Sequence, residues 1–363
     1  MDKKIILFID SLRAGGAERV CVNLANSLSK KGVAVKILVM NYEQYGCGYK
    51  LLDEIEIVDL KCLKARNLFI PLLKYLYKNP ADTIICFNYE LTILLSLLKR
   101  FIPNVSFKLV ARNINSLSKL FGMSQSTYRK KIVLPLLKWS YKNSDVIVNQ
   151  CMAMKEEIDF LIPSCKGKTT YIYNIVNQEI QDFNNEVINE NRSRKPYLLY
   201  VGRLEPQKGL HDLILAFHKA MTYYPDLRLK IVGVGRLEDE LRKQVYQLKL
   251  ENQIDFDGFQ SDLLEYYLNA KAVVLTSQFE GFPNVLVESI SLGTPVISYD
   301  CCHGPKEIIN RTNGYLVEMN NIEQFSSAIG LLLNNKFDHN KIRNDAKDKY
   351  FENNVINKWI GVL

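Results

Sequence analysis

The chain has 363 residues, of which 47% are hydrophobic and 24% charged, so it has the composition of a folded protein and is too long for a single hydrophobic core. Its 18 glycines and 11 prolines exclude collagen-like and low-complexity classes. Residues 1–175 hold 26 Lys and Arg against 14 Asp and Glu, a net charge of +12, whereas the remaining residues have a net charge of −4. This basic half predicts an anionic partner, and charge alone leaves nucleic acid, anionic lipid and a phosphorylated substrate open.

The first predicted element is the apolar run Ile5–Ile9, which follows two lysines and ends at Asp10. Five apolar residues are too few for the hydrophobic region of a signal peptide and far too few to span a bilayer. We therefore expect a cytoplasmic protein.

Strands and helices alternate through the first half. After the turn Asp10–Gly16, the apolar spacing of Ala17–Lys31 predicts a helix that ends at Gly32, and Val33–Met40 predicts the next strand. Further strands are predicted at Thr83–Phe87, Phe107–Ala111, Val146–Asn149 and Thr170–Tyr173. The intervening segments are long enough for crossover helices, so we expect a doubly wound parallel sheet.

The segment Asn177–Lys195 is poor in apolar side chains, which predicts a solvated linker and places the domain boundary there, with one domain at 1–178 and the other at 179–341. The second half alternates again and predicts a second doubly wound domain. Its strands are predicted at Tyr197–Val201, Arg228–Val232, Ile254–Phe256, Ala272–Thr276 and Val296–Tyr299, and its helices at about His211–Met221, Leu237–Lys249, Asp262–Asn269 and Pro283–Leu292.

Neither the cysteines nor the histidines form a metal-binding pattern. The eight cysteines include no C-x-x-C pair, and the four histidines are widely separated, so we expect reduced thiols and no metal.

The turn after the first strand holds Gly15 and Gly16 where a helix begins, which would let backbone N–H groups approach a phosphate or a sugar. The turn lacks G-x-G-x-x-G, and the chain lacks G-x-x-x-x-G-K-[ST], so hydride transfer and P-loop hydrolysis lose their main support. The alternative is that the glycines only permit a tight turn.

Two cations, Arg203 and Lys208, lie five residues apart on the turn after the strand Tyr197–Val201. This spacing allows both to bind one diphosphate, and the alternative is a role in surface solubility.

A loop and helix near the C-terminus carry the most specific pattern, EGFPNVLVESISLGTPVI, which begins at Glu280 and includes Glu288. Both carboxylates are predicted to face one cleft, and the free N–H groups of about Asn284 to Leu286 would form an anion site for a phosphate. The carboxylates would accept hydrogen bonds from sugar hydroxyls, and the alternative is solvated helix acids.

Gly15-Gly16-Ala17-Glu18-Arg19, Arg203 with Lys208, and the Glu-x7-Glu spacing together resemble the retaining glycosyltransferases of family 4, and in style the bacterial enzymes that extend polyprenyl-diphosphate-linked glycans. The resemblance covers almost the whole chain. It implies an α/β GT-B fold of two Rossmann-like doubly wound parallel-sheet domains facing a cleft. It also implies that a terminal helix at about 342–363 packs back on the first domain.

Carried over to this chain, the resemblance implies that Arg203 and Lys208 neutralise the diphosphate of a nucleotide-sugar donor, while Glu280 holds the donor sugar. Glu288 would hold the ribose, and backbone groups of the segment Asp257–Phe259 would meet the base. The other implied substrate-binding residues are Gly15, Gly16, Glu18, Gly235, Phe259, Gly281, Phe282, Asn284, Val285 and Leu286. Where many relatives have histidine, this chain has Arg112, for which a catalytic and a structural role both remain open.

The expected activity is retaining transfer of a sugar, from UDP rather than GDP, to a lipid-linked glycan, without a metal or other cofactor. Basic residues border the apolar runs Leu68–Tyr77 and Ile132–Trp139, which predicts peripheral binding to an anionic membrane surface, and the alternative is that these runs only pack into the core. We expect no nucleic-acid partner, because no recognised motif is present. The rival functions are a GT-B-fold epimerase or phosphorylase, and a non-catalytic nucleic-acid or carbohydrate binding protein.

Overall fold

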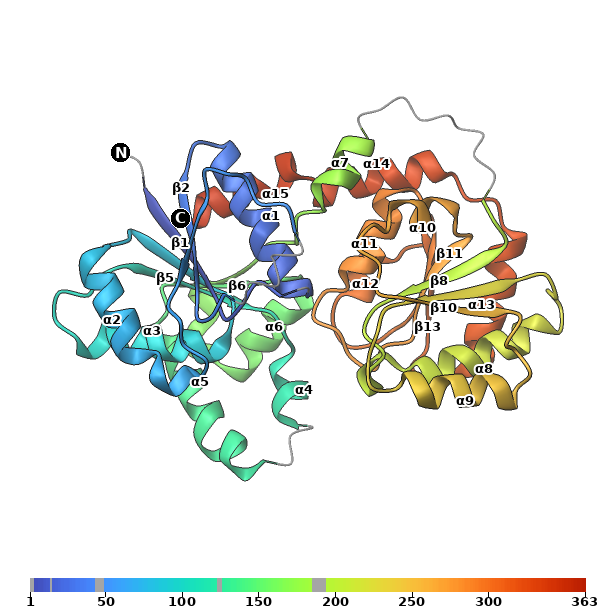
Figure 1. Cartoon of the computed structure of the whole chain (residues 1–363), viewed down its shortest axis with the longest axis horizontal. Coiled ribbons are helices and arrows are strands. Elements are labelled where there is room, and N and C mark those ends of the chain that lie inside the picture. Colours follow the sequence, from blue (N-terminus) through green and yellow to red (C-terminus); the bar gives the residue numbers. More distant parts are fainter. Residues whose placement is uncertain (1–2, 14, 43–48, 123–125, 185–193) are drawn as a thin grey trace. The chain divides into compact units, whose positions relative to one another are not determined.

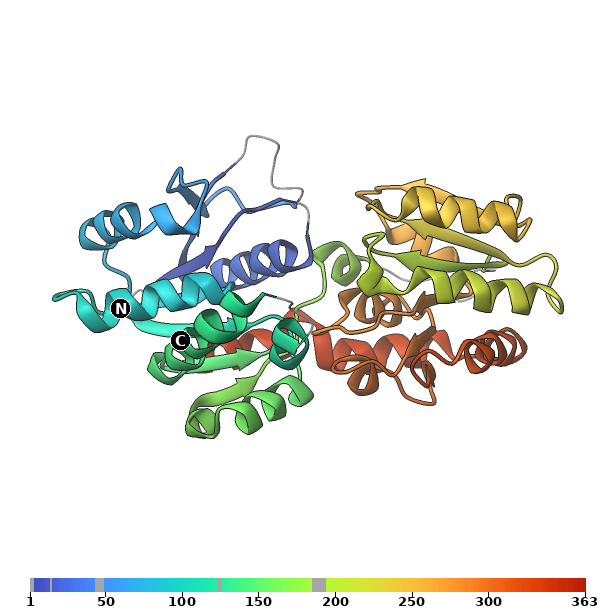
Figure 2. The same cartoon turned by 90° about the horizontal axis from the view of Figure 1, so that it is seen from below.

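The computed structural model describes residues 3–13, 15–42, 49–122, 126–184 and 194–363. The chain divides into two compact units, one formed by residues 1–175 with 352–363 and the other by residues 176–351. Each unit is a parallel sheet with helices on both faces (Figures 1 and 2).

The sheet of the first unit has the strand order β3-β2-β1-β4-β5-β6-β7 in the part of the chain that the structure describes. The strands are β1 Lys4–Ile9, β2 Ala34–Val39, β3 Glu56–Asp59, β4 Thr83–Cys86, β5 Lys108–Asn113, β6 Val146–Asn149 and β7 Thr169–Tyr171. The helices are α1 Gly16–Lys30, α2 Phe69–Lys78, α3 Tyr89–Phe101, α4 Leu117–Gly122, α5 Leu134–Asn143, α6 Met152–Leu161 and α15 Glu352–Val362. Shorter helical turns are η1 Ala65–Asn67, η2 Arg129–Val133 and η3 Pro163–Lys168.

Alternating side chains of β1 explain why this sheet is covered on both faces. Ile5, Leu7 and Ile9 belong to a core that also contains residues of α1 and α15, whereas Ile6 and Phe8 belong to a core with α2 and α3. Successive side chains of a strand point to opposite faces, so an apolar run of this kind is buried only between two layers of helices.

The sheet of the second unit has the order β10-β9-β8-β11-β12-β13 among the described residues. The strands are β8 Tyr197–Val201, β9 Arg228–Val232, β10 Ile254–Gly258, β11 Ala272–Leu275, β12 Val296–Tyr299 and β13 Gly314–Val317. The helices are α7 Gln178–Phe183, η4 Pro206–Lys208, α8 Leu210–Met221, α9 Glu238–Gln247, α10 Leu264–Asn269, α11 Asn284–Ser291, α12 Pro305–Ile308, α13 Ile322–Asn334 and α14 His339–Tyr350. The predicted pair of doubly wound parallel sheets is confirmed.

Two segments differ from the sequence expectation. The predicted linker begins with the helix α7, because the Asn177 side chain accepts a hydrogen bond from the Glu179 N–H (3.0 Å), and residues 185–193 of it lie outside the described residues. The single terminal helix expected at about 342–363 is two helices, since Phe351 is extended (φ −78°, ψ 155°) and separates α14 from α15. Of these, α15 belongs to the first unit and α14 to the second.

Among the residues that the structure describes, no helix is both long and apolar enough to cross a bilayer.

Candidate functional site

The turn after β8 carries the two predicted cations in different surroundings. Arg203 is exposed, whereas Lys208 is partly buried and its Nζ lies 2.6 Å from Glu280 Oε1. The turn is held against the end of β11, because the Thr276 hydroxyl donates to the Lys208 carbonyl (3.1 Å). Gly209 has φ 62° there, and a Cβ at this position would overlap the Thr276 carbonyl.

Glu280 lies between β11 and α11 and is 8% exposed. Its negative charge adds to the effect of burial on Tyr200, and together they raise the pKa of that phenol well above its ordinary value. The Lys208 ammonium therefore neutralises a carboxylate in a poorly solvated place, where removal of one partner would leave a costly buried charge.

Helix α11 positions the second glutamate. Glu288 is 4% exposed, and its Oε2 accepts a hydrogen bond from the Tyr267 hydroxyl of α10 (2.8 Å). A carboxylate has about four acceptor positions, so one carboxylate can accept more than one hydrogen bond. Sequence reasoning missed Tyr267, because nothing in the local pattern links α10 to α11.

The predicted anion site at the start of α11 is smaller than expected. The N–H of Leu286 donates to the Pro283 carbonyl (3.1 Å), so the prediction that it is free is wrong. Helix α11 begins at Asn284, which is half-buried like Val285. The side chains of Phe282 and Leu286 are buried, and Phe282 packs against Tyr350 with ring centroids 6.0 Å apart. Either residue could therefore meet a ligand only through its backbone.

The turn after β9 packs against the turn after β8. A Cβ on Gly235 would overlap the Leu204 backbone, and a Cβ on Gly233 would overlap the Gly202 carbonyl. The Leu204 N–H donates to the Val234 carbonyl (3.0 Å). Gly235 is therefore required for the contact between the turn after β8 and the turn after β9. This structural requirement is separate from the predicted contact of Gly235 with a substrate.

Two apolar side chains stay exposed at the carboxyl ends of β9 and β10. Phe259 is 61% exposed and follows Gly258, whose φ is 66°, and Val234 is 52% exposed. Their exposure fits contact with a planar base. The sequence analysis predicted that the segment Asp257–Phe259 contacts the base through its backbone, so it did not foresee the exposed ring of Phe259. Val234 was missed because a single valine in a turn carries no signal.

In the first unit, the Glu18 carboxylate fills the space beside Gly15 in the turn before α1. Gly15 caps α1, whose first residue is Gly16, and a Cβ on Gly15 would overlap the Glu18 carboxylate. The Gly15 carbonyl accepts a hydrogen bond from the Tyr49 hydroxyl (2.8 Å). An incoming phosphate would meet a carboxylate at this helix terminus, so the turn fits a sugar hydroxyl better.

Arg112, at the carboxyl end of β5, is 3% exposed and donates a hydrogen bond to Asn174. Its guanidinium lies 5.0 Å from the Phe87 ring centroid and 5.9 Å from that of Trp359 on α15. Burial lowers the pKa of Arg112 to about 10. A side chain enclosed by two aromatic rings is shielded from ligands, so this location favours the structural role over the catalytic one.

The chain is similar to known proteins in sequence. Residues 181–349 match the model of the family described as glycosyl transferases group 1. The chain is 32% identical over 223 residues to an uncharacterized glycosyltransferase of Methanocaldococcus jannaschii, a match that covers 60% of this chain and about half (53%) of that relative.

A second relative matches over nearly the full length. The chain is 27% identical to the N-acetylgalactosamine-N,N'-diacetylbacillosaminyl-diphospho-undecaprenol 4-alpha-N-acetylgalactosaminyltransferase of Campylobacter jejuni, over 96% of this chain and 93% of the relative. Among solved structures, Staphylococcus aureus TarM, crystallised with UDP, has a similar fold with a TM-score of 0.80 at 15% identity, covering 99% of both chains.

These similarities and the two doubly wound sheets show that the chain has the GT-B fold, and that its residues 181–349 are similar to the group 1 glycosyl transferases. The segment that matches the group 1 family lies within the second unit, which also holds Arg203, Lys208, Glu280 and Glu288.

Proposed function

We propose that this protein is a retaining glycosyltransferase of family 4 that transfers a hexose or N-acetylhexosamine from a UDP-linked donor to a polyprenyl-diphosphate-linked oligosaccharide, in the assembly of a surface polysaccharide or another glycan. The observation that carries the proposal is the ion pair (2.6 Å) between the partly buried Lys208, on the same turn as exposed Arg203, and the buried Glu280. The lipid-linked substrate in the name of the Campylobacter relative and the UDP bound to TarM support the choice of acceptor and donor.

The donor diphosphate is assigned to Arg203 and Lys208. An ammonium group has three N–H donors, so Lys208 can keep its bond to Glu280 while it binds a phosphate oxygen. Both cations then stabilise the charge that develops on the leaving diphosphate. Glu280 accepts a hydrogen bond from a hydroxyl of the donor sugar next to that phosphate, and Glu288, which also accepts a hydrogen bond from Tyr267, accepts hydrogen bonds from the ribose hydroxyls.

In the proposed reaction, the bond between the anomeric carbon and the diphosphate oxygen breaks as the acceptor hydroxyl forms a new bond on the same face. The hydroxyl proton goes to the departing diphosphate, so neither glutamate becomes a covalent nucleophile. Two side-chain cations do the work that a metal does in other phosphate sites, and transfer should therefore persist in EDTA.

The acceptor is assigned to the first unit, with 1–178 as the acceptor domain and 179–341 as the donor domain. Apolar side chains on α2 and η2 are exposed beside lysines, with Ile70 62% and Ile132 47% exposed. Lys74, Lys130 and Lys131 are exposed, and no ion pair joins them to a carboxylate among the described residues. This chemistry fits anionic lipid head groups, so we place the enzyme on the cytoplasmic face of the membrane as a peripheral protein.

The test incubates the protein with UDP- and GDP-sugars and polyprenyl-diphosphate-linked glycans, and reads the products by mass spectrometry and the anomeric configuration by NMR. We expect one added sugar, from a UDP donor, with retained configuration. Glu280→Gln should reduce transfer more than UDP binding, whereas Glu205→Gln, which removes the partner of exposed Arg236, should leave both nearly unchanged. No transfer from any donor would contradict the proposal, and an inverted product would contradict the mechanism.

A further inference from the structure

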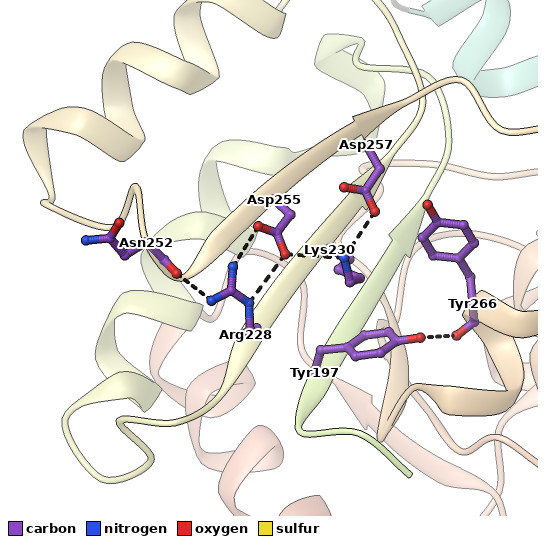
Figure 3. Close-up of polar contacts among 7 residues, drawn as sticks. All are labelled: Tyr197, Arg228, Lys230, Asn252, Asp255, Asp257 and Tyr266. Atoms are coloured by element: carbon purple, nitrogen blue, oxygen red, sulfur yellow. Dashed lines mark hydrogen bonds and ion pairs between the residues drawn. The ribbon is translucent and has the colours of Figure 1, made fainter.

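A polar network lies where β9 meets the edge strand β10 of the second sheet (Figure 3). Lys230 Nζ lies 3.3 Å from Asp255 Oδ2 and 3.2 Å from Asp257 Oδ2. Arg228 forms a separate ion pair with Asp255 (2.7 Å) and donates to the Asn252 carbonyl (2.7 Å). Two cations on one strand thus face two carboxylates on its neighbour.

Asp257 occupies an irregular position in β10. Asp255 pairs with Lys230 and Phe256 with Ile231, but the next paired residue of β10 is Gly258, which lies opposite Val232. Asp257 is therefore the extra residue of a β-bulge. A bulge leaves such a residue out of the ladder and changes the direction of the strand, so the ion pair to Lys230 fixes a residue that the ladder does not.

The bulge leads directly into the turn that holds the exposed aromatic side chain. The Gly258 carbonyl accepts a hydrogen bond from the Gly233 N–H (2.7 Å), and the Gln260 side chain donates to the Asp257 carbonyl (2.8 Å). Phe259 lies between these two anchors and is 61% exposed. The direction of its ring thus depends on the conformation of the bulge.

We propose that Lys230 and Asp257 are positioning residues for the nucleobase of the donor, because their ion pair fixes the bulge that presents Phe259. The inference rests on the proposed function and adds to it two side chains that do not touch the substrate. Base stacking on an aromatic ring tolerates different bases but requires the ring to be held in place.

The exposure of the Lys230 and Asp257 side chains indicates that their ion pair contributes more to positioning than to the stability of the fold. The Lys230 and Asp257 side chains are 27% and 19% exposed, and ion pairs near the surface contribute little to folding. Burial lowers the pKa of Lys230, but hydrogen bonds and charges from Asp257 and Asp255 outweigh burial and raise it, so Lys230 stays charged at neutral pH. Its loss should therefore change ligand binding more than the melting temperature.

The experiment measures the Kd of UDP and of inorganic pyrophosphate by calorimetry on the full chain. Lys230→Met, Asp257→Asn and Phe259→Ala should each weaken UDP binding about tenfold, the scale for loss of one base stack. Pyrophosphate lacks a base, so its affinity should stay within about twofold in all three variants. In the transfer assay, the KM for the donor should rise at nearly constant kcat. Arg228→Met is the matched control, since it removes a cation of the same network whose polar contacts, among the described residues, are with Asp255 and Asn252.

Unchanged UDP affinity in both Lys230→Met and Asp257→Asn would overturn the inference, and so would a parallel loss of pyrophosphate affinity, which indicates general disruption. The double variant Lys230→Met with Phe259→Ala should bind UDP no more weakly than Phe259→Ala alone, and additive losses would show that Lys230 does not act through the ring. If the parent protein binds GDP and not UDP, the assignment of a UDP-linked donor fails. The Kd of GDP, measured in the same variants, then tests the inference about Lys230 and Asp257. A parent that binds neither nucleotide overturns both.

Discussion

Lys208 and Arg203 share one turn, but within the described part of the chain only Lys208 has a charged partner, Glu280 at 2.6 Å. Replacement of either cation with alanine should lower turnover roughly 10²–10³-fold, the usual scale for loss of one group that stabilises developing charge. Arg203→Ala should leave the melting temperature unchanged because the side chain is exposed. Lys208→Ala should also lower the melting temperature, since it leaves the buried Glu280 carboxylate unpaired.

Steady-state kinetics and thermal unfolding on the same samples check this prediction. Arg236→Ala is the control, because Arg236 is a 71% exposed cation on the neighbouring turn that pairs only with Glu205 in the described contacts. Near-normal turnover in folded Arg203→Ala and Lys208→Ala variants would contradict the assignment of the diphosphate to this turn.

At the residue scale, the sequence predicts charged site residues better than it predicts their partners. Spacing alone placed Arg203 and Lys208 on one turn, since a turn after a strand keeps near neighbours together. The Lys208–Glu280 pair could not be predicted from the sequence, because 72 residues separate its members. The same holds for Arg112, for which the sequence leaves a catalytic and a structural role open, and which Phe87 and Trp359 enclose in the fold.

At the scale of elements, two turns of the second sheet pack backbone to backbone through glycine. A Cβ on Gly235 would overlap the Leu204 backbone. Gly235→Ala should therefore lower the free energy of unfolding by about 1–3 kcal/mol, the range for overpacked sites. Gly167→Ala is the control, because a Cβ there meets nothing within 4 Å. Urea unfolding measures both, and equal stability of the two variants would show that the turns separate easily.

Helix α14 is joined to the end of α11 by a histidine whose stability contribution depends on pH. His339 Nδ1 lies 2.8 Å from the Gly293 carbonyl, and burial followed by the charge of Arg194 lowers the pKa of His339 below its ordinary 6.5. The unfolded chain then binds a proton more readily than the folded chain. This contribution to stability is full above pH 6.5 and is lost as the pH falls through the lowered pKa.

We therefore expect the melting temperature to fall between pH 7.5 and pH 5.5, and His339→Gln should flatten that dependence. Exposed His218 provides the matched control, and His218→Gln should leave the slope of the parent. A slope that survives in His339→Gln would assign the pH dependence to other groups.

Elements with strong apolar periodicity were predictable, whereas short elements at the margins were not. The strands β1 and β8 were predicted nearly to their bounds because five consecutive apolar residues define each. The edge strands β3 and β13 were missed, since four residues with a partly exposed face carry little pattern. Helix α7 lies in a polar segment without apolar periodicity, and the Asn177 cap marks its start.

At the scale of the whole molecule, the charge is divided between the two units. Residues 352–363 add one Glu and one Lys to residues 1–175, so the first unit keeps a net charge of +12. On its outer helices the lysines stand next to exposed apolar side chains such as Ile70 and Ile132. Lys and Arg near an anionic membrane contribute about 1 kcal/mol each, and the attraction is screened over a Debye length.

The protein should therefore bind liposomes that contain anionic lipid and should dissociate as salt concentration rises. Changing Lys130, Lys131 and Lys138 to glutamate should weaken co-sedimentation and slow transfer to a lipid-linked acceptor, yet leave transfer to a short soluble analogue nearly unchanged. The same change of net charge at exposed Lys243, Lys249 and Lys336 in the second unit should affect neither measurement. If both triple variants lose liposome binding equally, total charge drives association, and the face formed by η2 and α5 is not the docking surface.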